Sequence, residues 1–192
     1  MKILTIGDII GNSGVKKVKE IIPEYKKQNN IDFIIANGEN SADGMGITLK
    51  IYETLKDSKV DMVTMGNHTW GKKEIFNFIN DEKIIRPANY PAGVPGEGYR
   101  IQECNGKKIA VINLLGRVNV TVLTENPFLK ADEILDKIKN KADIIIVDFH
   151  AEATAEKIAM GYFLDGKVTC LYGTHTHVAT ADETILEKEQ DI

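Results

Sequence analysis

The chain has 192 residues, 43% of them hydrophobic and 27% charged, which fits one water-soluble domain with a sizeable core. The net charge of −4 argues against a protein that coats nucleic acid, and no window approaches the ~20 apolar residues of a membrane span. We expect a single domain over residues 1–192 in the cytoplasm, with no membrane partner and no bulk nucleic-acid binding.

Apolar runs of strand length alternate with segments of helical period along the chain. The predicted strands cover residues 2–7, 32–38, 61–66, 107–116, 143–149 and 167–173. The predicted helices cover residues 14–28, 48–58, 72–80, 127–142 and 152–164. Residues 86–106, rich in Pro and Gly, interrupt the alternation and predict a loop with short antiparallel strands. This order predicts an α/β layered fold with a largely parallel sheet.

Local signals add detail to these elements. Ser13 is available as the cap of the helix over 14–28, and Thr48 as the N-cap of the helix over 48–58. Pro127 stands at a first-turn position, where its missing N–H does no harm. Cys104 and Cys170 match no CxxC spacing and predict reduced thiols in the core.

Polar residues follow five of the predicted strands, at the point where each strand ends. They are Asp8, Glu39 with Asn40, Asn67 with His68, His150, and His175 with His177, which include every histidine of the chain. In parallel α/β sheets, ligands bind outside the carboxyl ends of the strands. We therefore expect these side chains to converge on one crevice, although each of them alone is more often a turn, capping or otherwise unremarkable loop residue.

Carboxylate, amide oxygen and imidazole are ligands of divalent metals such as Mn, Fe and Zn. The set holds no thiolate, which argues against a structural zinc site, and it is too large for one tetrahedral ion. Two ions bridged by a carboxylate would use it, as in phosphatases and nucleases. The stretch GDIIGNSG over 7–14 matches neither GxGxxG nor a P-loop, so we do not expect nucleotide binding there.

Five motifs in chain order resemble the YmdB family of bacterial metallophosphodiesterases, within the calcineurin-like metallophosphoesterase superfamily. They are GDIIG, GEN, GNHTW, DFHAEAT and GTHTHVATAD, and the resemblance runs from Met1 to about Asp182. It implies a four-layer α/β/β/α sandwich with two mixed sheets. It also implies hydrolysis of phosphodiesters, including 2′,3′-cyclic nucleotides opened to 3′-nucleotides.

The same resemblance implies roles for the strand-end residues. One metal would be held by Asp8, Glu39, Asn40 and His177, and the other by Glu39, Asn67, His150 and His175, with Glu39 bridging. His68 would be the catalytic proton donor, facing the leaving group while a metal-bridging hydroxide attacks phosphorus. Iron or manganese is the expected metal, with zinc as the alternative, and the expected partner is a small phosphodiester substrate.

This chain departs from the wider superfamily pattern GDxH, because Ile10 stands where that histidine would be, and Asn40 is the expected substitute ligand. Family members normally continue past the last histidine motif, so an incomplete second sheet is expected in a chain that ends at Ile192. An incomplete second sheet would leave an edge strand unpaired. Whether the chain forms a homo-oligomer therefore stays open. Asp148 and Glu152 flank His150 and are candidates to orient it.

Other functions stay open at this point. The same metal centre would serve a phosphomonoesterase or protein phosphatase, or a non-catalytic regulator that binds nucleotide or RNA through the metals. A structural protein without metal is the last alternative. Arg117 and Lys72 are candidates for contacts with a phosphate or a base, or they are solvated surface charges.

Overall fold

The first half of the chain builds one parallel sheet in the computed structural model, which describes residues 1–187. Its strands pair in chain order and are β1 (Ile3–Ile6), β2 (Phe33–Asn37), β3 (Met62–Thr64) and β4 (Ile84–Ile85). The expectation of two mixed sheets is therefore wrong for this one. Each strand after β1 is reached through a helical crossover, which returns the chain to the same edge and keeps the strands parallel.

Three helical segments cover the outer face of this sheet, namely α1 (Gly11–Gln28), α2 (Leu49–Asp57) and the 3₁₀ helix η1 (Lys73–Asn77). Thr48 caps α2 as expected, since its hydroxyl accepts a hydrogen bond from the N–H of Ile51 at 3.3 Å. The prediction for Ser13 is wrong. Helix α1 begins earlier, at Gly11, so Ser13 lies inside it, and Ile10 occupies the cap position without a side-chain hydrogen bond.

The second half builds a mixed sheet from β5 (Tyr99–Cys104), β6 (Lys107–Leu115), β7 (Ile144–His150) and β8 (Cys170–Thr174). Strand β5 runs antiparallel to β6, which confirms the antiparallel strand expected within 86–106, and the other pairs are parallel. Helices α3 (Pro127–Ile138) and α4 (Thr154–Leu164) cover its outer face. Within residues 1–187, β8 is an edge strand of this sheet, and Cys170 in it is exposed. The expectation that Cys170 lies in the core is therefore wrong.

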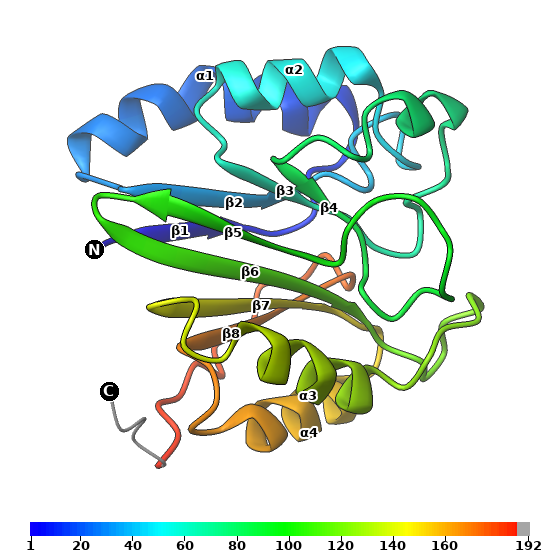
Figure 1. Ribbon diagram of the computed structural model, residues 1–192. Helices are drawn as coiled ribbons and strands as arrows, with labels where there is room; N and C mark the ends of the chain where they lie inside the picture. The colour runs from blue at the N-terminus through cyan, green and yellow to red at the C-terminus, as the bar shows by residue number, and fades with distance from the viewer. Residues whose placement is uncertain (188–192) are drawn as a thin grey trace.

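The two sheets pack face to face between the two helical layers, and the four-layer sandwich is confirmed (Figure 1). Their interface is apolar, with members from both sheets that include Phe33, Ile35, Met62, Ile109, Val111 and Ile146. Alternate residues of β2 face this interface and the helices, so the whole strand is buried. No helix within residues 1–187 is long and apolar enough to cross a membrane.

A buried contact fixes how the two sheets align. The side-chain amide of Asn37, at the end of β2, lies 3.4 Å from Oδ2 of Asp148 near the end of β7. The carboxyl ends of β2 and β7 therefore open on the same edge of the sandwich. This alignment brings loops from both halves of the chain to one place.

Candidate metal centre

The strand ends and loops at that edge carry all eight polar residues that the sequence analysis placed at strand ends. Hydrogen bonds and close polar contacts join them into one cluster, whose members are Asp8, Glu39, Asn40, Asn67, His68, His150, His175 and His177. The cluster includes a contact between residues 167 positions apart in the chain. The structure thus brings together every residue named from the strand ends.

Glu39 occupies the middle of the cluster and is fully buried. One carboxylate oxygen, Oε2, accepts a hydrogen bond from the backbone N–H of His68 at 2.8 Å, and Oε1 lies 3.0 Å from His150 Nε2. Burial acts to raise the pKa of Glu39, but the hydrogen bond and charge of His150 outweigh it and hold the pKa below its ordinary value. Glu39 is therefore a buried carboxylate in its charged form.

His150 Nε2 meets more acceptors than it can satisfy. It lies 3.0 Å from Glu39 Oε1, from Asn67 Oδ1 and from His175 Nδ1. One imidazole nitrogen carries at most one proton. Ligand atoms of Glu39, His150 and His175 all lie within 4.8 Å of one another. Lone pairs that converge in this way, from oxygen and nitrogen without a thiolate, fit a divalent cation of the Mn, Fe or Zn type.

A second group of donors lies beside the first. His177 Nε2 is 3.4 Å from Asp8 Oδ1 and 3.1 Å from the side-chain nitrogen of Asn40. Asp8 also accepts the backbone N–H of His175 at 2.9 Å through its other oxygen. Asp8, Asn40 and His177 are the residues that join Glu39 in the first expected ligand set, and the division into two sets stays a prediction.

The amide of Asn40 faces the cluster with its nitrogen, which lies 3.3 Å from both Asp8 Oδ1 and Glu39 Oε1. Its oxygen, the atom that would bind a cation, lies 2.8 Å from His68 Nδ1. With these orientations Asn40 positions His68, and a role as ligand requires the amide to turn over. The role expected for Asn40 as a metal ligand therefore stays a prediction.

A buried polar network supports His150 from the side facing the sheets. Its Nδ1 lies 2.9 Å from the hydroxyl of Thr174, which donates to Asp148 at 2.6 Å. Thr64 and Asn37 also donate to the Asp148 carboxylate. Burial raises the pKa of Asp148 to about 6 although both threonine hydrogen bonds act to lower it. Asp148 thus reaches His150 through Thr174, which fixes the orientation of the imidazole.

Glu152 contacts a different histidine from the one expected. Its carboxylate lies 2.9 Å from Nε2 of His175, and no contact joins it to His150 among the described residues. The expectation that Glu152 orients His150 is therefore wrong. Sequence reasoning also missed Thr174, although its place directly before His175, at the end of a strand, was a usable signal.

Gly66 lets the backbone of the β3 loop pass close to the donors. A Cβ atom at this position would overlap Oε2 of Glu39 and lie 2.5 Å from His150 Nε2. Only glycine avoids that overlap, so its presence directly before Asn67 and His68 is explained by packing. The alternative candidates for phosphate contact are less well placed, since Arg117 is exposed and Lys72 lies 3.9 Å from Asp43.

Comparison with known proteins gives consistent relatives. The family model described as YmdB-like protein matches residues 4–191. The chain is 51% identical over 189 residues to a 2′,3′-cyclic-nucleotide 2′-phosphodiesterase of Bacillus subtilis strain 168, covering 98% of this chain and 71% of that protein.

Solved structures resemble the chain over its whole length. A hypothetical protein from Thermus thermophilus superposes with a TM-score of 0.92 at 37% identity, covering 100% of this chain and 75% of the other. A structure described as a novel phosphatase from Mycoplasma pneumoniae superposes with a TM-score of 0.91 at 39% identity, covering 99% and 69%.

Proposed function

The chain belongs to the YmdB-like protein family, and from this premise we propose that it is a metal-dependent phosphodiesterase that opens 2′,3′-cyclic nucleotides to 3′-nucleotides. The observation that carries the proposal is the convergence of Glu39, Asn67 and His175 on one nitrogen of His150. Such a donor set binds cations that engage phosphoryl oxygens. The Bacillus subtilis relative, whose name states this activity, supports the choice of substrate.

We propose two divalent ions as the cofactor, iron or manganese with zinc as the alternative, because the donors are oxygen and nitrogen atoms without a thiolate. Asp8 and His177 would hold one ion and Asn67, His150 and His175 the other, with Glu39 shared, while the Asn40 oxygen keeps its contact with His68. A bound pair of divalent cations supplies positive charge to the phosphoryl group and lowers the pKa of a bound water.

The residues of the chain would then perform three tasks. Glu39 stays ionised in a water-excluded place, where its charge fixes the positions of its partners. Asn40 Oδ1 accepts a hydrogen bond from His68 Nδ1, which leaves Nε2 of that ring to meet the substrate. Water adds its hydroxyl to phosphorus and releases its other proton to solvent, the bond from phosphorus to the 2′ oxygen breaks, and that oxygen takes a proton from His68, which solvent then reprotonates.

We also propose a domain organisation and a cellular compartment for this protein. We propose that residues 1–192 act as one metallophosphoesterase domain on a small-molecule phosphodiester. The cytoplasm is the proposed compartment, because Cys104 and Cys170 are both free thiols and a reducing compartment keeps them so.

The test is hydrolysis by the Mn²⁺-loaded protein of bis-p-nitrophenyl phosphate, 2′,3′-cyclic AMP and the monoester p-nitrophenyl phosphate. We expect turnover of both diesters, loss of that turnover in Glu39→Gln, and full turnover in the exposed control Glu20→Gln. Faster turnover of the monoester would favour a phosphatase, the activity named for the Mycoplasma pneumoniae structure. Folded, metal-loaded protein without any turnover would overturn the proposal in favour of a binding regulator.

A further inference from the structure

The turn that carries His175 and His177 has an unusual backbone. Both histidines have positive φ, 96° and 55°, a region that residues other than glycine rarely adopt. Local strain of this kind persists only where surrounding contacts hold it. The contacts around this turn therefore decide whether the two imidazoles keep their places in the centre.

Besides the contacts that Glu152 and Asn40 make with the two imidazoles, two side chains outside the turn hold it. Asp8, itself a candidate ligand, accepts the backbone N–H of His175 at 2.9 Å. Lys157, from the first turns of α4, donates from Nζ to the hydroxyl of Thr176 at 3.3 Å. Thr176 lies between the two histidines and is not itself a candidate ligand, so this second contact acts on the turn alone.

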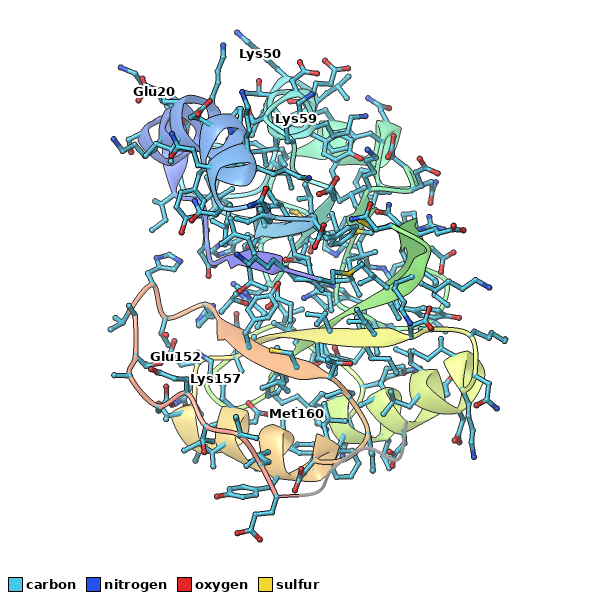
Figure 2. The ribbon with its side chains drawn as sticks, turned by 90° about the vertical axis from the view of Figure 1, so that its left-hand side faces the viewer. Glu20, Lys50, Lys59, Glu152, Lys157 and Met160 are labelled. Atoms are coloured by element: carbon cyan, nitrogen blue, oxygen red, sulfur yellow. The ribbon has the colours of Figure 1, made fainter. Side chains whose placement is uncertain are left out.

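The absence of a side chain at Gly173 makes room for the Lys157 side chain. Its stem crosses Gly173 in β8, where an added Cβ atom would lie 2.8 Å from Cδ and 3.0 Å from Cε of the lysine. Figure 2 shows Lys157 between α4 and the strand and loop above it, with Glu152 close by. The contacts of Lys157 with Gly173 and Thr176 thus connect α4 to the turn.

We propose that Lys157 is a positioning residue of the metal centre, which acts through Thr176 to hold the turn that presents His175 and His177. This inference rests on the proposed function of those histidines as ligands. The lysine does not touch the donor atoms in this arrangement; its ammonium group fixes the backbone from which they project.

The charge of Lys157 gives the inference a sharp test. Its ammonium lies in the field of Asp8, Glu152 and Asp148, three of the carboxylates around the centre. A positive charge near a cation site opposes cation binding by simple repulsion. If charge alone mattered, removal of the lysine would tighten metal binding, whereas loss of a positioning contact would weaken it.

The experiment measures Mn²⁺ affinity by isothermal titration calorimetry on the full chain. Lys157→Met keeps the apolar stem and removes the donor, and Thr176→Val removes the acceptor without changing charge. We expect both to weaken Mn²⁺ binding by about 10-fold to 100-fold, as is typical when a group that orients a ligand is lost. The double variant should have the same Mn²⁺ affinity as whichever single variant binds Mn²⁺ less tightly, because both substitutions remove the same contact.

Two further variants complete the design. Lys167→Met removes a lysine that pairs with Asp132 at 3.0 Å, away from the turn, and should leave Mn²⁺ affinity unchanged. Lys157→Arg keeps charge and donors and should bind Mn²⁺ more tightly than Lys157→Met. Circular dichroism of each metal-free variant verifies that it is folded.

Either of two results would overturn the inference. One is tighter or unchanged Mn²⁺ binding in Lys157→Met, and the other is unchanged binding in Thr176→Val. Because the measurement is metal binding, it does not depend on turnover. A wild type that binds Mn²⁺ but hydrolyses no diester would defeat the proposed function and leave the positioning role of Lys157 standing.

Discussion

The side-chain oxygen of Asn40 lies 2.8 Å from Nδ1 of His68, and this contact defines which nitrogen of the ring is free to react. The backbone N–H of His68 is held in turn by Glu39 Oε2 at 2.8 Å. The ring is one-third exposed, whereas the carboxylate behind it is fully buried. His68 is therefore a solvent-accessible imidazole fixed at two points, as a residue that meets a substrate should be.

Replacement of His68 by Ala should lower kcat for 2′,3′-cyclic AMP by about 10²-fold to 10⁴-fold, because the 2′ oxygen leaves poorly without a proton. The loss should be much smaller for bis-p-nitrophenyl phosphate, since nitrophenolate is a stable anion. Steady-state kinetics on both substrates measures this, and equal losses on the two would rule out the role of proton donor.

Substitution of Gly66 by Ala should disrupt the centre while the fold persists, because the new methyl group would overlap Glu39 Oε2 and crowd His150. We expect Mn²⁺ affinity to fall by at least about 10-fold. The matched control is Gly161→Ala in α4, where an added Cβ meets nothing within 4 Å. That control should gain about 0.5–1 kcal/mol in unfolding free energy and keep its metal affinity.

The unfolding free energy of the metal-free protein should depend on pH through the buried carboxyl of Asp148. Its pKa is raised from 3.8 in the unfolded chain to about 6 in the fold, so the native state binds the extra proton between those values. Its contribution to stability is therefore present at low pH and is lost as pH rises through about 6. The shift corresponds to at most roughly 3 kcal/mol.

Asp148→Asn should remove this component of the pH dependence. Urea titrations in the presence of a chelator, at a series of pH values from 4 to 8, would compare the slopes of the two proteins. Wild type should lose stability relative to the variant as pH rises. Parallel curves would mean that Asp148 stays ionised throughout this range.

Tyr52 donates a 2.6 Å hydrogen bond to Asp81, far from the centre. Burial acts to raise the Asp81 pKa, but this bond and the backbone N–H of Lys83 outweigh it and lower the pKa. Tyr52→Phe should therefore cost about 1.5–3 kcal/mol of unfolding free energy near neutral pH. That difference should shrink as pH falls below 3.8, because the unfolded chain takes up a proton on Asp81 there before the folded protein does. Denaturant titrations near neutral pH and in this acid range would measure it.

The centre was predictable from the sequence to the extent that strand ends determine it. Parallel strands deliver their carboxyl ends to one edge, so Asp8, Glu39 and His150 could be placed together without coordinates. The alternation of strands and helices likewise predicted the layers. What the pattern could not supply was the partner of each side chain, such as the contact of Glu152 with His175 rather than His150.

The misses in the fold have local physical causes. Helix α1 begins before Ser13, because a helix start is a weak signal when no side chain caps it. Cys170 lies in a strand as expected but is exposed, because its burial depends on the neighbour of β8 rather than on its own strand. Lys157 and Thr176 are residue types with no metal-ligand chemistry of their own, so only their contact reveals a role.

The contact between Asp8 and His175 joins residues that are made at opposite ends of translation. Asp8 leaves the ribosome early, whereas its partner emerges 167 residues later, after both sheets have been made. Until then the first sheet can fold, but Asp8 and Glu39 face water without the imidazoles that complete the set. A cation that takes donors from both sheets could be held only after β8 has docked, so the proposed centre would be completed late in translation.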